Sequence, residues 1–295
     1  ASELEMIAVL GTTPPWARPP GQENAEWTAP ADYAAFGDFV ARFAERYGDR
    51  VTYYQIWDQP NIYPYWGDRY VDPEEYGRLL REAATRIRAA DDDAVILLAG
   101  LAPNVEEGPL NLNEVEYLRR VLRSGAGPYF DVAAAKAYGF EVGPEDPRLD
   151  VRALNFGRVA LLRQVLEEEG RAQTPVWAVE FGWNALPSDW SGEPAPWGTG
   201  AAGTQALRSA QAVTRARQEW PWMGPMLWAR LLPPENPADP GYGFALLEED
   251  LSPTAFGREL LPLLGASAGP SLGWQQPSSP AATYSPGWRV SDQGA

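Results

Sequence analysis

The sequence predicts an α/β fold built on a parallel sheet, and three observations carry that prediction. Six short apolar runs alternate with amphipathic helical patterns along the 295 residues, and this alternation is typical of parallel strands joined by helices. Polar and aromatic side chains follow the apolar runs at their carboxyl ends, where an α/β barrel keeps its functional site. The run 94–99 is apolar throughout, as expected for a strand covered on both faces.

The first half of the chain carries three of these repeats. We expect its strands at 6–10, 51–57 and 94–99. A helix is predicted over 31–47, because apolar residues recur there every three or four positions, at Tyr33, Phe36, Val40 and Phe43. A second helix is predicted over 73–90, with Asp72 as its N-cap, Pro73 at its first position and two glutamates in its first turn.

The second half repeats the same order of elements. We expect strands at 130–137, 175–180 and 222–228. Helical patterns cover 113–124, 150–169, 204–219 and 253–264, and glycines end the first two of them. A loop of about twenty residues separates the fifth of the six strands from the helix that follows it.

Six strands are two short of a closed eight-stranded barrel. A doubly wound α/β sheet is one interpretation of the six repeats. We favour the other, a (β/α)₈ TIM-barrel-like fold whose first two strands lie upstream of Ala1, so that 1–264 supplies strands three to eight. The segment 265–295 is rich in Pro, Ser and Gly, and we interpret it as a linker or the start of a further domain.

Composition excludes several classes of partner and cofactor. The net charge of −16 disfavours nucleic acid and anionic membranes as partners, and no apolar run is long enough to span a membrane. The chain has no cysteine and no histidine, which removes the thiolate and imidazole ligands of most metal sites. We therefore expect no metal and no cofactor.

Two strand ends carry the residues of greatest chemical interest. The strand 51–57 runs into Trp57-Asp58-Gln59-Pro60-Asn61, and the strand 175–180 ends in Glu180, followed by Phe-Gly-Trp183. Both stretches resemble motifs of the clan A retaining glycoside hydrolases, the (β/α)₈ barrels that include cellulases and β-xylosidases. That clan carries Trp-Asn-Glu-Pro at the end of barrel strand four and its nucleophile in a Glu-Phe-Gly-Trp context at strand seven.

The resemblance implies a catalytic pair with one member altered. Glu180 matches the nucleophile, and Gln59 stands at the position of the general acid/base. The two side chains of a retaining pair lie about 5 Å apart, so we expect Gln59 and Glu180 to converge. Three explanations of Gln59 are open: a natural degenerate site, a deliberate Glu→Gln change, or a misassigned glutamate. Asp58 is a further candidate for the acid.

The only lysine, Lys136, lies near the end of the fourth run, two residues before Tyr138. The clan usually has histidine at this position, so the lysine is a departure from the pattern. We expect Lys136 to pair with Glu180 or Asp58. A Schiff-base lysine that attacks carbonyl groups is the alternative hypothesis.

Aromatic side chains accumulate at or after the strand ends, and together they suit a carbohydrate groove. The resemblance implies that Trp228 lies under the sugar ring, as the strand-eight tryptophan of the clan does. The residues expected to bind substrate are Trp57, Asp58, Asn61, Lys136, Tyr138, Trp183 and Trp228.

These features favour a glycoside-hydrolase-like domain of an extracytoplasmic, multidomain protein, secreted or on the cell surface. With Gln59 in place of the acid, we expect little or no hydrolysis by the sequence as it stands. The alternative is a pseudoenzyme, a non-catalytic surface or scaffold module with protein partners in a larger assembly.

Overall fold

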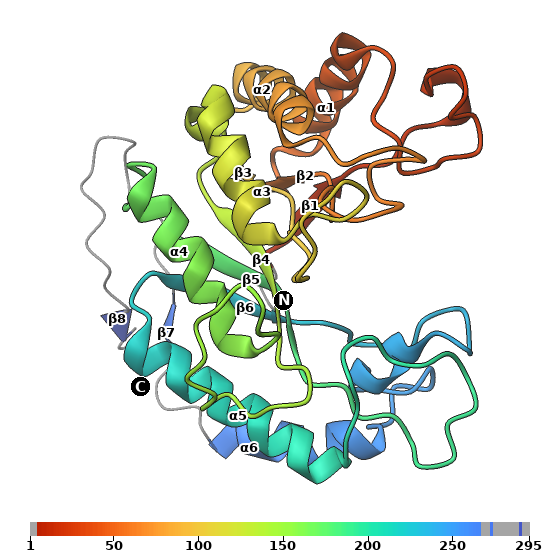
Figure 1. Ribbon diagram of the computed structural model, residues 1–295, viewed down its shortest axis with the longest axis vertical. Helices are drawn as coiled ribbons and strands as arrows, with labels where there is room; N and C mark the ends of the chain where they lie inside the picture. The colour runs from red at the N-terminus through yellow and green to blue at the C-terminus, as the bar shows by residue number, and fades with distance from the viewer. Residues whose placement is uncertain (1–4, 267–271, 274–288, 291–295) are drawn as a thin grey trace. The chain divides into compact units, whose positions relative to one another are not determined.

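The computed structural model describes residues 5–266, 272–273 and 289–290 (Figure 1). The chain divides into two compact units. Unit 1 takes in the described residues up to 135 together with 161–176, and unit 2 takes in 136–160 and the described residues from 177 onward. Three elements contribute residues to both units: β4 (Ala133–Tyr138), α4 (Val159–Glu168) and β5 (Val176–Gly182).

Unit 1 is built on a three-stranded parallel sheet in the order β1-β2-β3. Its strands are β1 (Ile7–Leu10), β2 (Tyr53–Ile56) and β3 (Val95–Leu97), with Ile7 opposite Tyr53 and Tyr53 opposite Val95. The middle strand β2 is buried along its whole length. Isolated parallel bridges, Leu97–Val132 and Leu101–Ala135, continue the pairing beside β3.

Three helices begin at sequence-encoded caps in unit 1. These are α1 (Tyr33–Tyr47), α2 (Pro73–Ala90) and α3 (Glu114–Val121). Asp32, Asp72 and Asn113 each accept a hydrogen bond from a backbone N–H of the first turn, at 2.7–3.0 Å. α1 and α2 lie side by side (Figure 1). The short helical turns η1 (Pro15–Ala17), η2 (Leu122–Ala126) and η3 (Gly127–Tyr129) complete this unit.

A buried tyrosine fixes α2 to the sheet of unit 1. Tyr76 is fully buried; its hydroxyl donates to the carbonyl of Ile56 at 2.9 Å and accepts from the N–H of Ala99 at 2.7 Å. These bonds satisfy backbone groups at the ends of two neighbouring strands, where the sheet ladder stops. The carboxyl ends of β2 and β3 are therefore held in register by a helix side chain.

Unit 2 contains most of a second three-stranded parallel sheet, in the order β4-β5-β6, with β6 at Met223–Trp228. Two helices, α5 (Ala202–Glu219) and α6 (Ala255–Ala266), lie side by side (Figure 1). Their contact is apolar and includes Ala206, Phe256 and Leu260. The turns η4 (Phe156–Arg158) and η5 (Pro240–Phe244) belong to the same unit.

The α/β class expected from the sequence is confirmed, and the six strands lie where the apolar runs placed them. The prediction that all six are neighbours in one parallel sheet is wrong, because they form two three-stranded sheets. The helix predicted over 73–90 is found with the same bounds. A single barrel domain over 1–264 and two preceding strands stay predictions.

The helix predicted over 150–169 is wrong in its first half, because α4 begins only at Val159. The residues before it form a loop whose polar side chains bond to one another. Asn155 Nδ2 donates to Asp146 and to the carbonyl of Arg148, while Asn155 Oδ1 accepts from the N–H of Arg158 at 2.8 Å. Asparagine and aspartate offer the backbone such local alternatives to a helix.

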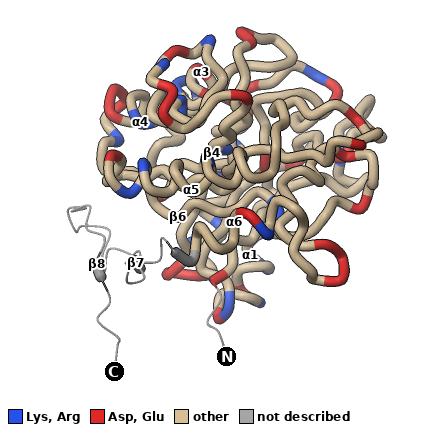
Figure 2. Tube along the Cα trace, turned by 90° about the horizontal axis from the view of Figure 1, so that it is seen from below, with Lys and Arg blue, Asp and Glu red and all other residues tan. Residues whose placement is uncertain are grey.

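The predicted linker, 265–295, lies mostly outside the described residues. Two short strands in it, β7 (Leu272–Gly273) and β8 (Arg289–Val290), pair antiparallel. Within the described part of the chain we find no helix that combines the length and apolar character of a membrane span. Figure 2 shows that the acidic residues of this strongly negative chain are spread over many surface segments rather than gathered in one patch.

Candidate active site

The polar centre of unit 2 is Glu180, near the carboxyl end of β5. Its side chain is 33% exposed, and Lys136 of the neighbouring strand β4 places Nζ 2.7 Å from Glu180 Oε1. The lysine side chain is only 3% exposed. A buried ammonium group needs a charged or polar partner to offset the cost of leaving water. Lys136 therefore pairs with Glu180, which is one of the two partners expected from the sequence.

The second oxygen of Glu180 also has a donor. Tyr138, two residues after Lys136 on β4, donates its hydroxyl to Glu180 Oε2. Residues two apart on a strand face the same side, so Lys136 and Tyr138 reach the same carboxylate. The structure thus brings together Lys136, Tyr138 and Glu180, and the carboxylate is held at both oxygens.

An aromatic cluster surrounds Tyr138. Its ring centroid lies 5.4 Å from those of both Trp197 and Phe244, and Phe140 packs against its edge. Trp197 comes from the loop after β5 and Phe244 from η5, so three separate segments supply this surface. The sequence predicted that aromatic residues gather after the strand ends, but it singled out neither Trp197 nor Phe244, because neither sits in a motif.

Trp228, at the end of β6, lies against the backbone of β5. A Cβ on Gly182 would lie 2.9 Å from the Trp228 ring, and Gly182 has a φ of +135°, so glycine is required there on both grounds. The indole N–H donates to the carbonyl of Phe244 at 2.7 Å, and the ring meets the face of Phe181 edge-on at 5.0 Å. Trp228 is half-buried.

Trp183 has a packing role in unit 2. It is fully buried, and its indole N–H donates to the carbonyl of Val142 at 2.7 Å. A Cβ on Gly139 would lie 1.7 Å from the indole ring, so only glycine permits this contact. The tryptophan thereby fixes the segment that directly follows Tyr138.

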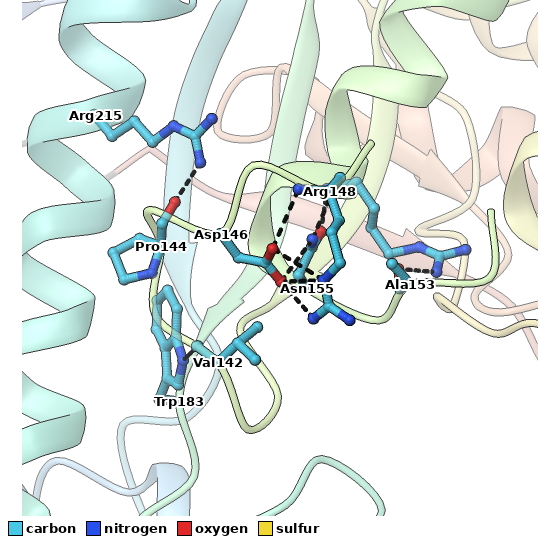
Figure 3. A network of polar contacts seen from close by, with 9 residues as sticks. Val142, Pro144, Asp146, Arg148, Ala153, Asn155, Trp183 and Arg215 are labelled. Carbon is cyan, nitrogen blue, oxygen red and sulfur yellow. Dashed lines mark hydrogen bonds and ion pairs between the residues drawn. The ribbon is translucent and has the colours of Figure 1, made fainter. Parts of the chain in front are cut away.

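The same segment is held by a network of polar contacts (Figure 3). Arg148 donates to both oxygens of Asp146, and Arg215 of α5 donates to the carbonyl of Pro144. Hydrogen bonds from Arg148, which outweigh the cost of burial, hold the pKa of Asp146 well below its usual range. The loop that follows Tyr138 is therefore held both by its own side chains and by Arg215 of α5.

The second motif lies in unit 1, at the end of β2. Trp57 is fully buried, its indole N–H donates to the carbonyl of Tyr65 at 2.7 Å, and its ring packs edge-on against Trp27, Phe36 and Trp66. Every hydrogen-bonding group of this side chain is engaged inside the unit. Its role in the structure is to fill the core beneath the motif.

Asn61 is also fully buried. Its side-chain amide donates to the carbonyls of Ala102 and Leu112 at 2.8 and 3.0 Å, and its carbonyl oxygen accepts from the N–H of Ala102 at 2.9 Å. These bonds tie the motif to the segment that follows β3. The contacts of Asn61 are thus structural ones within unit 1.

Asp58 and Gln59 are the half-buried members of the motif. Gln55 Nε2 donates to one oxygen of Asp58 at 3.2 Å, and Gln59 Nε2 donates to the other at 3.3 Å. The backbone of Trp57 and Gln59 is left-handed, with φ of 70° and 50°, a conformation that costs free energy in non-glycine residues. Asp58 is therefore a hydrogen-bond acceptor held between two amides.

Within the described residues, no group of three or more acidic side chains is arranged to hold a metal ion. Each unit therefore has its own candidate group: a carboxylate with two donors in unit 2, and an aspartate between two amides in unit 1. Chemically, the first can act as a held nucleophile or as a hydrogen-bonding anchor for a ligand hydroxyl.

Comparison with known proteins identifies the fold. No family model matches the chain, and no curated protein matches it by sequence. A family 39 glycoside hydrolase from the gut symbiont Bacteroides cellulosilyticus WH2 is similar in structure, with a TM-score of 0.66 and 20% identity, over 88% of this chain and 50% of that chain. The family 39 enzyme from Xanthomonas axonopodis pv. citri gives 0.56 at 17% identity, over 81% and 47%.

A glucosidase from Croceicoccus marinus gives a TM-score of 0.59 at 15% identity, over 80% of this chain and 46% of that chain. The chain thus spans about half the length of these solved structures. At these identities the likeness is one of fold: the chain shares the α/β architecture of family 39 glycoside hydrolases, which are TIM barrels. This favours the barrel over the doubly wound sheet.

Proposed function

We propose that this chain is a glycoside-hydrolase-like domain that binds carbohydrate, with Glu180 as the nucleophile position of a retaining mechanism and Gln59 at the acid/base position. One observation carries the proposal: both carboxylate oxygens of Glu180 accept hydrogen bonds, one from Lys136 and the other from Tyr138. A strand-end carboxylate held in this way is oriented for attack on an anomeric carbon. The fold shared with family 39 glycoside hydrolases supports it.

In the first step of such a mechanism, Glu180 attacks the anomeric carbon and forms a covalent glycosyl intermediate, which water then hydrolyses. Tyr138 and Lys136 hold the carboxylate in place during the approach. The rings of Trp197 and Phe244 beside Tyr138 offer apolar surface for the C–H face of a sugar. An ion-paired Lys136 carries a proton and no free lone pair, which disfavours the Schiff-base hypothesis.

The proton for the leaving group is the missing component. The carboxamide of Gln59 has no acidic proton, and loss of a general acid costs about 10²–10⁴-fold in rate. Asp58 is a poor substitute, because both of its oxygens already accept hydrogen bonds from the amides of Gln55 and Gln59. We therefore expect substrates with natural sugar leaving groups to turn over very slowly.

The test restores the proton donor. Gln59→Glu should raise hydrolysis of oligosaccharides by about 10²–10⁴-fold, while aryl glycosides with acidic phenols gain little because their leaving groups need no protonation. Glu180→Gln should abolish hydrolysis of both. Gln211→Glu, the same chemical change at an exposed position of α5, is the matched control and should change neither rate.

The second candidate function is a non-catalytic module that binds sugar or a protein partner, and Gln59 is the observation that favours it. The same assay separates the two. If Gln59→Glu hydrolyses no gluco, xylo, galacto or manno substrate, aryl glycosides included, the glycosidase proposal fails and the scaffold function stands.

Carbohydrate as the ligand and an extracytoplasmic location, secreted or at the cell surface, belong to the same proposal. Fractionation of the source cells, with immunodetection of the protein, tests the location. A protein found only in the cytoplasmic fraction contradicts it.

A further inference from the structure

Unit 1 contains a pocket of about 460 Å³ that neither sequence motif includes. It lies where the segment after β1 meets the first turns of α1 and α2, and its volume is within the range of small-molecule sites. Prolines and alanines form its apolar wall. The polar lining consists of Tyr33, Arg69, Glu75 and Arg78.

The lining is positively charged, although the chain carries a net charge of −16. Two arginines and one glutamate leave one positive charge in the pocket. Arg69 Nη2 lies 2.9 Å from Glu75 Oε2, which satisfies that carboxylate and leaves the second arginine uncompensated. A local charge opposite to that of the whole protein concentrates anions at one place.

Arg78 is the uncompensated cation. It is exposed on α2, and among the described residues no carboxylate lies within ion-pair distance of it. The glutamates one turn before and after it are paired elsewhere, Glu74 with Arg120 at 2.6 Å and Glu82 with Arg86 at 2.9 Å. Its guanidinium is thus available to a ligand, and its planar fork fits a carboxylate.

Tyr33 supplies a second polar group beside Arg78. Its hydroxyl is buried near the Glu75 carboxylate and makes no hydrogen bond of standard geometry among the described residues. Burial, and then the nearby Glu75, raise the pKa of Tyr33, so the hydroxyl stays protonated. A buried polar atom without a partner is costly, and a ligand oxygen in the pocket would remove that cost.

We propose that this pocket binds an acidic sugar unit, with the carboxylate of a uronic acid on Arg78 and a ring oxygen or hydroxyl on Tyr33. The preference for an anion rests on the pocket alone, whereas the sugar class rests on the proposed function. The apolar wall of prolines and alanines accommodates the carbon skeleton.

The test is calorimetric titration of the protein with three probes: glucuronate, glucose and acetate. Glucuronate should bind at least about tenfold more tightly than either of the others, since a charged hydrogen bond and a ring contact are both needed. Equal affinity for glucose overturns the anion preference. Equal affinity for acetate overturns the sugar class.

Variants locate the binding. Arg78→Gln should weaken glucuronate binding about tenfold or more, and Arg78→Lys, which keeps the charge but loses the fork, should lie between. The matched control is Arg42→Gln, an exposed arginine of α1 that makes no ion pair with the described residues, about 13 Å along the helix from Tyr33. An equal loss in the control overturns the site.

The titration is repeated with Glu180→Gln, whose residue lies in unit 2. Retained glucuronate binding in this variant supports the pocket whatever the hydrolysis assay gives. Binding lost in Glu180→Gln but kept in Arg78→Gln overturns the pocket and leaves the proposed function standing.

Discussion

The Lys136–Glu180 pair allows a quantitative test of how the candidate site is held. Replacing Lys136 by methionine keeps most of the side-chain volume and removes the ammonium, which lies 2.7 Å from Glu180 Oε1. The partner carboxylate is then left one-third exposed, with only Tyr138 as a donor. Hydrogen bonds to charged groups contribute about 1.5–3 kcal/mol, and the exposure of Glu180 places the expected coupling at the lower end of that range.

A double-mutant cycle isolates this contribution from any other contact of either residue. The variants are Lys136→Met, Glu180→Gln and the two combined, and the assay is denaturant unfolding of each. The combined variant should be more stable than the sum of the two single losses predicts, by about 1.5 kcal/mol. A coupling below about 0.3 kcal/mol would refute the assignment of Lys136 as the structural partner of Glu180.

Three further predictions follow from the same unit. Tyr138→Phe removes the donor to Glu180 Oε2 and should lower the kcat of the acid-restored enzyme by about tenfold with little change in Tm, whereas an unchanged kcat contradicts the assigned contact. Gly139→Ala places a Cβ 1.7 Å from an indole carbon and should destabilise by about 3 kcal/mol, measured by denaturant unfolding; a stability equal to wild type contradicts the close approach. Arg148 lowers the pKa of Asp146, so the ionised aspartate stabilises the fold above its unfolded pKa near 4, and this stabilisation is lost as the pH falls further. Asp146→Asn should therefore lower Tm at pH 7, and the difference from wild type should shrink towards pH 2. A Tm difference that does not change with pH refutes this prediction.

The sequence predicted those parts of the fold that local patterns determine. The start of α2 followed from Asp72 and Pro73, because a cap and a first-turn proline act within a few residues of the helix start. The strands followed from short apolar runs, because a strand of a parallel sheet is buried on both faces and so carries apolar residues at successive positions. These are effects of neighbouring residues, and they need no knowledge of distant contacts.

Distant contacts decided the rest. The loop before α4 is set by Asp146, Arg148 and Asn155, whose side chains bond to one another over up to nine residues, although the local pattern is helical. The burial of Trp57 and Trp183 likewise depends on indole N–H bonds to carbonyls 8 and 41 residues away. No periodicity in the sequence distinguishes a tryptophan that stacks on a ligand from one that fills a core.

The contacts of Gln59 bear on whether the site has lost its chemistry. Its backbone is held in the left-handed region, where a non-glycine residue costs about 1 kcal/mol or more. That geometry does not depend on the side-chain carboxamide, because the N–H of Gln59 bonds to the carbonyl of Gly100 at 3.2 Å. A glutamate at this position has the same length and the same backbone contacts.

The glutamate side chain would, however, meet Asp58 at the place where the amide of Gln59 now donates. Two carboxylates at that distance disfavour each other's ionisation, so Asp58 would raise the pKa of the glutamate. A general acid must carry a proton before it can donate one. For this reason we expect the carboxyl group of Gln59→Glu to act as a proton donor rather than as a second anion.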